Sequence, residues 1–370
     1  MDLQPFLLDE WTSRFSAASP AIEFNLAGST GPRWTLSEVA ALGDAMPDLT
    51  DLPLDYSSAD GSRALREAIA AYHGADPEWV VVTTGGSEAL SLLFCVLEQP
   101  GAGILIGDPG YPAYAAMAKA WRLETQTYRL VRTERYAQSS DAVLAAVTAR
   151  TVAAIVNTPH NPTGSVMMRS EVSLLAGALA ARGIPLIVDE VFHPIYFGAP
   201  QPSNANIDNV IVVGDMSKAL SLPGLRLGWI IDRDPERRAR LINARSYFAI
   251  SHSPLLERIA THALTNAATI LRRTQAVADA NLKTLETMLS RSRGLLDWVK
   301  PEGGTTVFPW FVDGRDSRPF CEAAAVQGVL IAPGDCFGQP DHFRIGIASQ
   351  TRGLERGLKI AAAIIEDGKA

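Results

Sequence analysis

The stretch Gly214–Trp229, GDMSKALSLPGLRLGW, decides how the rest of the chain is interpreted. It follows the β-branched run Val210–Val213 and is interrupted by proline and glycine, so it predicts a loop behind a buried strand. Lys218 is one of only six lysines and lies in nearly uncharged company, whereas an ordinary surface lysine near a helix start rarely does. An amine in an apolar pocket near other cations has a lowered pKa, so its neutral form can attack an aldehyde. Arg226, eight residues further on, could bind a phosphate with its planar guanidinium group.

Short apolar runs alternate with helical patterns on the N-terminal side of this stretch. This alternation is typical of an α/β fold, in which a mostly parallel sheet lies between helices. The predicted strands are Trp79–Thr83, Gly103–Ile106, Val152–Val156, Pro185–Val188 and Val210–Val213. The predicted helices between them are Ser87–Leu97, Tyr114–Ala120 and Glu171–Ala181.

The C-terminal part has a different pattern. A long helical run without glycine or proline, Arg258–Arg293, is predicted to lead out of the large domain. Beyond it we expect strands in Trp298–Val312 and His342–Ala348 and helices in Arg318–Gln327 and Arg352–Ile365. We therefore predict a large domain over residues 46–285 and a small α+β domain over 286–370. The N-terminal segment 1–45 is expected to join the small domain.

Composition narrows the class of protein. The formal charge of −7 and the lack of any Lys/Arg run argue against nucleic acid as a partner. The N-terminus lacks the pattern of a signal peptide, and no window reaches the ~18–20 apolar residues of a membrane span. Three scattered cysteines and six histidines without paired spacing predict no disulfide scaffold and no metal site. We expect a cytoplasmic protein.

The loops that follow the predicted strands carry polar residues and aromatics. Ligands of α/β sheets bind at the carboxyl ends of the strands, so these loops are the place to look for a site. In Thr83–Ala89, TTGGSEA, the residues Gly85, Gly86 and Ser87 begin a predicted helix. The free backbone amides at its start could bind an anion. An N-capped helix behind a tight turn explains the same pattern. In Asp108–Tyr114, DPGYPAY, Tyr111 is either exposed above a flat ligand or a core aromatic.

Two further loops add an amide and a carboxylate. Asn157–Gly164, NTPHNPTG, is either an extended loop that presents Asn161 or a simple rigid turn. Asp189 ends a buried strand, where a carboxylate needs a positive charge or donors. A protonated pyridine nitrogen would meet that need, and a helix N-cap is the alternative.

Together these segments resemble the fold-type-I enzymes of the class I/II aminotransferase superfamily, which use pyridoxal 5′-phosphate (PLP). The resemblance is carried mainly by Ser217–Gly228, SKALSLPGLRLG, and by Asn161–Gly164, NPTG, and it extends from about Tyr56 to Ala348. It implies that Lys218 forms the internal aldimine with PLP and then moves a proton between the substrate Cα and the cofactor C4′. It also implies a homodimer that binds an amino acid and a 2-oxo acid.

The resemblance assigns further contacts by position. Asp189 would pair with the pyridinium nitrogen, and Tyr111 would stack on the ring. Asn161 would bind the cofactor's 3′-oxygen and help to hold the substrate. The phosphate would be held by Gly85, Gly86, Ser87 and Arg226 and, from the partner subunit, by Tyr56. Arg344, in the sequence FRIGIA, would bind the substrate α-carboxylate.

Two positions depart from the family pattern. Phe192 occupies the place of a tyrosine that usually donates to the 3′-oxygen, a bond to a charged group worth ~1.5–3 kcal/mol, so we predict a raised aldimine pKa. Asp215 replaces a phosphate-binding serine or threonine, and because a phosphate would repel it, we expect it to face a cationic substrate side chain. Asp9 and Glu10 could assist it, or they could be a solvated tail.

The sequence supports three hypotheses for the function. The first is an aminotransferase that moves an α-amino group to a 2-oxo acid. The residues at positions 192 and 215, Phe192 and Asp215, also resemble those of a subgroup of PLP enzymes that act on arginine. This subgroup contains the arginine oxidases and hydroxylases and capreomycidine synthase. The second hypothesis is therefore an oxidase, hydroxylase, cyclase or lyase that acts on arginine or a related cationic amino acid. The third, a non-catalytic PLP-fold protein, is disfavoured because the cofactor residues are intact.

Overall fold

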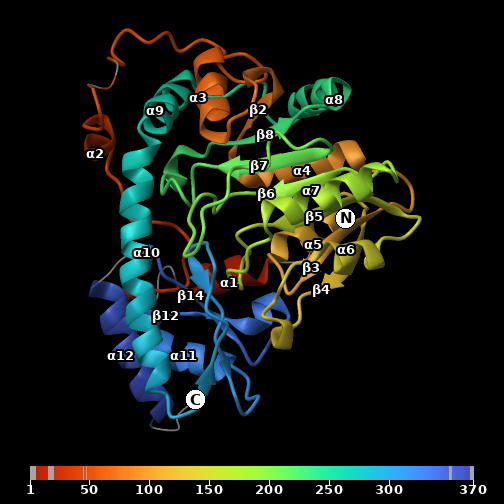
Figure 1. Ribbon diagram of the computed structural model, residues 1–370. Coiled ribbons are helices and arrows are strands. Elements are labelled where there is room, and N and C mark those ends of the chain that lie inside the picture. Colours follow the sequence, from red (N-terminus) through yellow and green to blue (C-terminus); the bar gives the residue numbers. More distant parts are fainter. Residues whose placement is uncertain (1–5, 16–20, 45, 47, 350–351, 367–370) are drawn as a thin grey trace.

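The computed structural model describes residues 6–15, 21–44, 46, 48–349 and 352–366, and a seven-stranded sheet lies at its centre (Figure 1). The strand order is β2-β8-β7-β6-β5-β3-β4, and within this sheet β8 alone runs opposite to the other six strands. The strands are β2 Val80–Thr83, β3 Gly103–Asp108, β4 Glu124–Arg129, β5 Thr151–Asn157, β6 Leu186–Asp189, β7 Val210–Asp215 and β8 Gly228–Asp232. The predicted α/β fold with a mostly parallel sheet is therefore confirmed.

The sheet is apolar on both faces because its central strands are buried on both sides. In β7, Val210 and Val212 pack into the core on one face, whereas Ile211 and Val213 pack into the core on the other. This alternation is the side-chain period of a strand. Near-continuous β-branched runs are therefore the expected sequence of this sheet.

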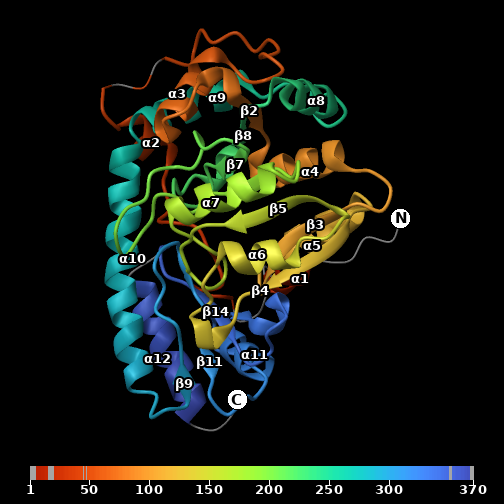
Figure 2. The same cartoon turned by 45° about the vertical axis from the view of Figure 1, so that its right-hand side comes forward.

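Helices cover both faces (Figures 1 and 2). One face packs against α4 Gly85–Leu97, α5 Pro112–Ala120 and α8 Pro235–Arg245. The other packs against α3 Arg63–His73, α6 Ser140–Ala146, α7 Arg169–Ala180 and α9 Pro254–Thr265. Helices α4, α5 and α7 lie close to where the sequence predicts them.

Two strands of the central sheet and one break between helices were not predicted from the sequence. Strand β4 is an edge strand with mostly exposed polar residues, and β8 has too short an apolar run to stand out. The predicted helical run Arg258–Arg293 contains two helices, α9 and α10 Ala267–Ser290, which meet at Asn266. The Asn266 Nδ2 group donates to the carbonyl of His262 at 3.0 Å, a local bond that competes with the helix.

A second apolar core lies beside the sheet domain. It contains residues of α1 Leu7–Arg14, the C-terminal half of α10, α11 Arg318–Val326 and α12 Arg352–Glu366. Short strands complete it: β1 Phe24–Asn25, β9 Leu296–Asp297, β10 Thr306–Val307, β11 Trp310–Phe311, β12 Val329–Leu330, β13 Ala332–Pro333 and β14 Phe343–Gly346. The helix α2 Leu36–Ala40 lies near α9 instead.

The expectation of strands throughout 298–312 was wrong in extent. Only β10 and β11 form there, because Pro301, Gly303 and Gly304 make a turn that packs against the loop after β5. β1 pairs with β12, and α10 runs through the predicted boundary at 285/286. Residue 45 lies outside the described residues, so the domain limits stay predictions. Among the described helices, none is long and apolar enough to cross a membrane.

A substitution at Gly228 tests how β8 packs against the start of α4. A Cβ atom there would lie 2.5 Å from the Gly85 carbonyl carbon and 2.8 Å from the Gly86 nitrogen, both backbone atoms. We expect Gly228→Ala to lower the free energy of unfolding by roughly 2–3 kcal/mol, measured by chemical denaturation. Gly177→Ala on α7 is the control: its Cβ would meet nothing within 4 Å, so a gain of about 0.5–1 kcal/mol is expected. Equal effects of the two changes would contradict this packing.

Candidate active site

A cavity of about 300 Å³ lies at the carboxyl ends of the central strands and reaches the second core. Nine of the residues predicted for the site line it: Gly86, Ser87, Tyr111, Asn161, Asp189, Asp215, Lys218, Arg226 and Arg344. They come from the first turn of α4, the loops after β3, β5 and β7, the last residues of β6 and β7, and β14. Residues more than 250 positions apart in the sequence thus meet in one place.

The N-terminus of α4 and Arg226 form one end of the cavity. Gly85 has φ +73°, and a Cβ there would lie 2.7 Å from the Arg226 Nη2 atom, so the guanidinium lies directly against this turn. The first amides of a helix have no intrahelical acceptor, and the helix dipole favours an anion beside them. The arrangement fits a phosphate group.

Asp189 lies in the floor of the cavity and is almost fully buried. Its Oδ2 atom accepts from the Tyr114 hydroxyl at 2.6 Å, and its Oδ1 atom accepts from the amide of Val191 at 3.1 Å. Burial raises its pKa to about 6, although both hydrogen bonds act in the opposite direction. A carboxylate in this position is suited to a cationic partner such as a pyridinium nitrogen.

Lys218 follows β7, and its Nζ atom donates to the Ser29 hydroxyl at 3.0 Å. Burial lowers the pKa of this amine, and the negative charge of Asp215 opposes that shift. A larger neutral fraction makes the amine a better nucleophile and proton acceptor. The sequence analysis did not identify Ser29, because nothing in a short N-terminal segment indicates that it will lie beside a lysine 189 positions away.

Arg344 and Asn161 are joined on the side of the cavity near the second core. The Arg344 Nη1 group donates to the Asn161 Oδ1 atom at 3.0 Å, and Nη2 donates to the Ala27 carbonyl at 2.6 Å. Among the described residues, Arg344 Nε is a buried donor without an acceptor. Burial lowers the pKa of Arg344 to about 10. A carboxylate in the cavity would relieve this buried positive charge.

The two tyrosines at the start of α5 differ from the prediction. Tyr111 lines the cavity and meets Tyr114 edge to face, with 5.5 Å between ring centroids. It is Tyr114 that binds Asp189, and the sequence analysis did not assign it to the site. Its position three residues after Tyr111, on the same helix face, was the available signal.

A second group of acidic residues lies in the same cavity. Asp9 on α1 and Asp215 at the end of β7 both line it, whereas Glu10 does not, although Asp9 and Glu10 are both exposed. Asp215 Oδ1 accepts from the amide of Ser217 at 2.8 Å. Burial is the main cause that raises the pKa of Tyr111 to about 12, and the negative charge of Asp9 adds to it. Asp9 is therefore close enough to act on the site.

Of two other residues singled out in the sequence, Phe192 lines the cavity and Tyr56 does not. Phe192 is buried and lines the cavity with a ring that has no hydroxyl to donate. Tyr56 is 83% exposed and lines a different cavity, near α9. Within one chain, Tyr56 does not meet the other predicted site residues.

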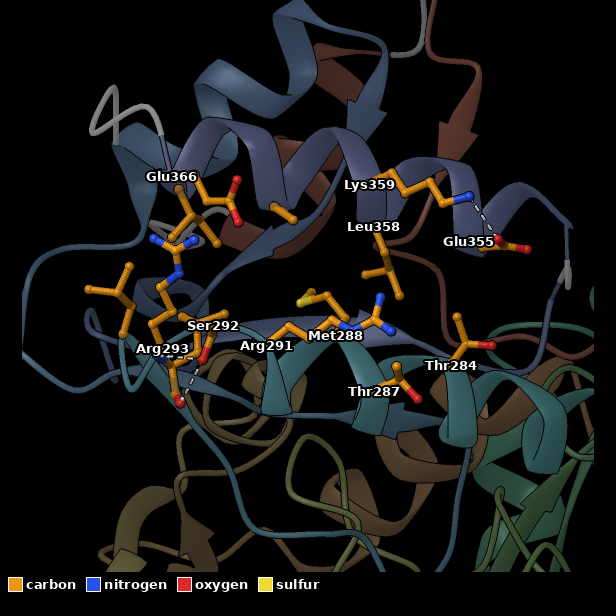
Figure 3. Close-up of a pocket in the computed structure, with 14 residues that line it drawn as sticks. Thr284, Thr287, Met288, Arg291, Ser292, Arg293, Glu355, Leu358, Lys359 and Glu366 are labelled. Carbon is orange, nitrogen blue, oxygen red and sulfur yellow. Dashed lines mark hydrogen bonds and ion pairs between the residues drawn. The ribbon is translucent and has the colours of Figure 1, made fainter.

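A larger cavity, of about 620 Å³, lies between α10 and α12 (Figure 3). The side chains of Met288 and Leu358 face each other across it, and Lys359 forms an ion pair with Glu355 at 2.8 Å on one rim. None of the residues predicted for the site lines it. Among the described residues, no cluster of three or more His, Cys, Asp or Glu side chains could hold a metal ion.

Comparison with known proteins agrees with this geometry. The family model of class I and II aminotransferases matches residues 45–359. The chain belongs to this family. Among curated relatives, the capreomycidine synthase of Streptomyces vinaceus is 33% identical over 352 residues, which cover 93% of this chain and 89% of that protein.

Solved structures of the family have the same fold. A PLP-dependent aminotransferase from Streptococcus suis superposes with a TM-score of 0.91 at 25% identity, covering 99% of each chain. The PLP-dependent cyclase OrfR superposes with a TM-score of 0.89 at 26% identity, covering 100% of this chain and 98% of that one. The predicted family, fold type I and PLP as the cofactor are confirmed. The anion end, the buried Asp189 and the half-buried Lys218, whose pKa is lowered, fit PLP.

The buried Asp189 carboxyl predicts a pH dependence of the protein without cofactor. Its folded pKa of about 6 lies above the ordinary value of 3.8, so the folded state loses stability as the pH rises from about 4 to about 6. Asp189→Asn removes this titration. We therefore expect the melting temperature of the apoprotein to fall relative to the Asn variant over this range.

Bound cofactor should reverse the order of the melting temperatures of the unmodified protein and the Asp189→Asn variant. With PLP bound, a cationic ring nitrogen stabilises the carboxylate, so the unmodified holoprotein is expected to melt above the Asn variant at pH 7. Melting curves at pH 4, 5, 6 and 7, with and without PLP, measure both effects. A constant difference between the two apoproteins would contradict the assigned burial of this charge.

Proposed function

We propose that the protein is a PLP-dependent aminotransferase that moves the amino group of a cationic α-amino acid to a 2-oxo acid. The observation that carries the choice of substrate is the placement of Asp9 and Asp215 in the same cavity as Lys218 and Arg344. A site that acts on an α-amino acid requires a positive group, such as an arginine, for the carboxylate and a base beside the Cα atom. A positively charged side chain needs carboxylates in addition.

The chemical roles are divided among a few residues. Bound PLP supplies an aldehyde that joins an amine and a ring that withdraws electrons from the substrate Cα. Asp189 holds a negative charge at the ring nitrogen, and Tyr114 keeps that carboxylate oriented through its 2.6 Å bond. Lys218 takes and returns the Cα proton, and Ser29 holds its Nζ atom between these steps.

The remaining residues position the substrate and cofactor. Arg344 binds the α-carboxylate, and its bond to Asn161 leaves the Nδ2 group of Asn161 as a donor for the cofactor. Gly85, Gly86, Ser87 and Arg226 hold the phosphate at the start of α4, and Tyr111 packs on the ring. Each of these roles is part of the proposal.

We also propose a cytoplasmic homodimer with shared sites. Tyr56 is too far from its own chain's cavity to line it, and its exposed side chain is free to reach a partner's phosphate. Exposed apolar residues that a partner could cover support this: Leu54, Tyr247 and Ile250 are 79%, 84% and 60% exposed.

A second reaction is favoured by specific observations. Phe192 removes a donor that aminotransferases usually place at the 3′-oxygen, and the chain is similar to capreomycidine synthase and to the cyclase OrfR. The second candidate is therefore a cyclase, oxidase, hydroxylase or lyase that acts on arginine or a related cationic amino acid. It would use Lys218, Arg344 and the two carboxylates in the same way but need no 2-oxo acid.

One experiment tests the function and separates the two reactions. L-arginine, L-lysine, L-norleucine and L-aspartate are added singly to the holoenzyme, with and without pyruvate and with and without oxygen, while the cofactor spectrum and products are recorded. We expect turnover with the cationic amino acids only, and only with pyruvate. Ammonia release, oxygen uptake or a cyclised product without pyruvate would replace amino transfer by the second candidate. A response confined to norleucine or aspartate would refute the cationic substrate.

The same assay tests Lys218. We expect Lys218→Ala to lose the visible absorbance of the lysine-bound cofactor and all turnover, since the variant has no amine to join the aldehyde or move the proton. Turnover at the unmodified rate would refute the mechanism.

Substitution of the acidic residues tests how the side chain is recognised. We expect Asp215→Asn and Asp9→Asn each to raise the KM for arginine roughly 10- to 100-fold, the range for a hydrogen bond to a charged group. The dissociation constant of norleucine, measured from the cofactor spectrum, should stay within twofold. Glu10→Gln is the control, because Glu10 lies on the same helix but outside the cavity. Equal losses for arginine and norleucine would mean that the carboxylates do not recognise the side chain's charge.

A further inference from the structure

Three hydrogen-bonded side chains, the buried Tyr136 and His342 and the half-buried Asp341, lie next to the strand that carries Arg344. The Tyr136 hydroxyl and the His342 Nε2 atom are 2.6 Å apart, and His342 Nδ1 is 2.6 Å from the Asp341 Oδ1 atom. Tyr136 belongs to the loop after β4 in the sheet domain, and His342 immediately precedes β14 in the second core. These bonds connect the two parts of the molecule.

The direction of the hydrogen bonds follows from the chemistry of the groups. Burial is the main influence on His342 and lowers its pKa, so its ring is neutral at pH 7. The Asp341 carboxylate can only accept, so the ring proton lies on Nδ1. His342 Nε2 is then an acceptor, and the Tyr136 hydroxyl is its donor. Both ring nitrogens of His342 then have a hydrogen-bond partner. Loss of the Tyr136 hydroxyl would leave the buried Nε2 acceptor unpaired.

His342 and Arg344 share one face of the strand. Phe343 and Ile345 are fully buried in the second core. Side chains alternate along a strand, so His342 and Arg344 point the other way, toward the sheet domain. His342 is held there by Tyr136, and Arg344 meets Asn161 two residues further on.

The backbone at Tyr136 is strained in a way that its surroundings must support. Arg135 and Tyr136 have φ of 58° and 56°, two successive non-glycine residues in the left-handed region. Such residues persist where surrounding contacts hold them. The Tyr136 side chain is only 2% exposed and has His342 as its polar partner.

Neighbouring contacts fix the same junction. Arg132 forms an ion pair with Asp341 at 3.1 Å, and its guanidinium lies 5.0 Å from the centroid of the Trp310 ring. Phe308 stacks on His342, with 4.6 Å between centroids. On the other side of the loop, Gln138 donates to the carbonyl of Asn157, which lines the active-site cavity. The loop thus touches both the strand of Arg344 and the floor of the site.

We propose that Tyr136 is a positioning residue for Arg344: by binding His342 it fixes the start of β14, and so places the Arg344 guanidinium for the substrate carboxylate. The proposal rests on the carboxylate-binding role proposed above for Arg344. It requires no contact between Tyr136 and the substrate. Its consequence is selective, because only ligands that carry the α-carboxylate depend on where Arg344 lies.

The experiment compares amino acids with the amines that lack their carboxylate. Dissociation constants of L-arginine and agmatine, and of L-norleucine and pentylamine, are measured from the change in the cofactor spectrum of the holoenzyme. We expect Tyr136→Phe to weaken binding of each amino acid that binds the unmodified enzyme roughly three- to tenfold, the effect of one hydrogen bond. Amine binding should stay within twofold. His342→Gln, which breaks the same link from the other side, should change the amino acid to amine ratio in the same direction.

Two control variants separate positioning from general loss of stability. Tyr128→Phe removes the hydroxyl of an equally buried tyrosine, 2% exposed, whose bond to the Ile155 carbonyl at 3.1 Å stays within the sheet domain. It should lower the melting temperature as Tyr136→Phe does but leave the ratio unchanged. Arg344→Gln should abolish the preference for amino acids.

The outcomes are distinguishable. A normal ratio in Tyr136→Phe together with a lost preference in Arg344→Gln would overturn the positioning role and leave Arg344 as the carboxylate ligand. An unchanged preference in Arg344→Gln would overturn the role of Arg344 itself, and the positioning role with it. An equal change of ratio in Tyr128→Phe would mean that the effect is a general loss of stability.

Discussion

A carboxylate buried at the end of a central strand raises the free energy of the folded chain unless donors or a positive charge meet it, and Asp189 is such a group. Two donors, Tyr114 and the Val191 amide, use only part of the hydrogen-bonding capacity of this carboxylate, and its pKa stays raised. The cavity around it supplies the rest of a PLP site: an anion end at α4 and the half-buried amine of Lys218, which follows the neighbouring strand β7. The folded chain is thus less stable alone than with a cationic ring above Asp189, so binding of the cofactor and stability of the fold are linked.

The second constraint is the junction between the sheet domain and the core built on α10, α11 and α12. The sheet carries Asp189 and Lys218, whereas Arg344 comes from β14 and Asp9 from α1. In the proposed function, the substrate's reacting carbon and its recognition groups would therefore be held by different parts of the molecule. Side-chain bonds across the junction, Arg344 to Asn161 and Tyr136 to His342, set the distance between them. Small shifts there would affect the substrate more than the cofactor.

A site residue could be predicted where the pattern that marks it lies in the residues next to it in the sequence. Asp189 and Lys218 each follow a β-branched run, and parallel neighbouring strands bring their ends together without further information. Ser29 and the approach of Asp9 depend on how the N-terminal segment crosses the second core, where Trp11 Nε1 binds the carbonyl of Ile331. No pattern along the sequence encodes such a contact. Strand β4 escaped for a different reason: as an edge strand it is mostly polar, so it lacks the apolar run that marks its neighbours.

The reaction and the substrate are separate questions in this site. Lys218, Asp189 and Arg344 serve any chemistry that begins with loss of a proton from the substrate Cα, so their presence does not favour amino transfer over cyclisation or oxidation. In the proposed function, Asp9 and Asp215 would recognise the side chain and would not determine the steps after proton loss. Phe192 differs from both groups, because in the proposed function its missing hydroxyl would change the electronic state of the cofactor itself. On the proposed roles, the reaction outcome would be controlled at the ring and its 3′-oxygen, whereas substrate choice would be controlled at α1 and the end of β7.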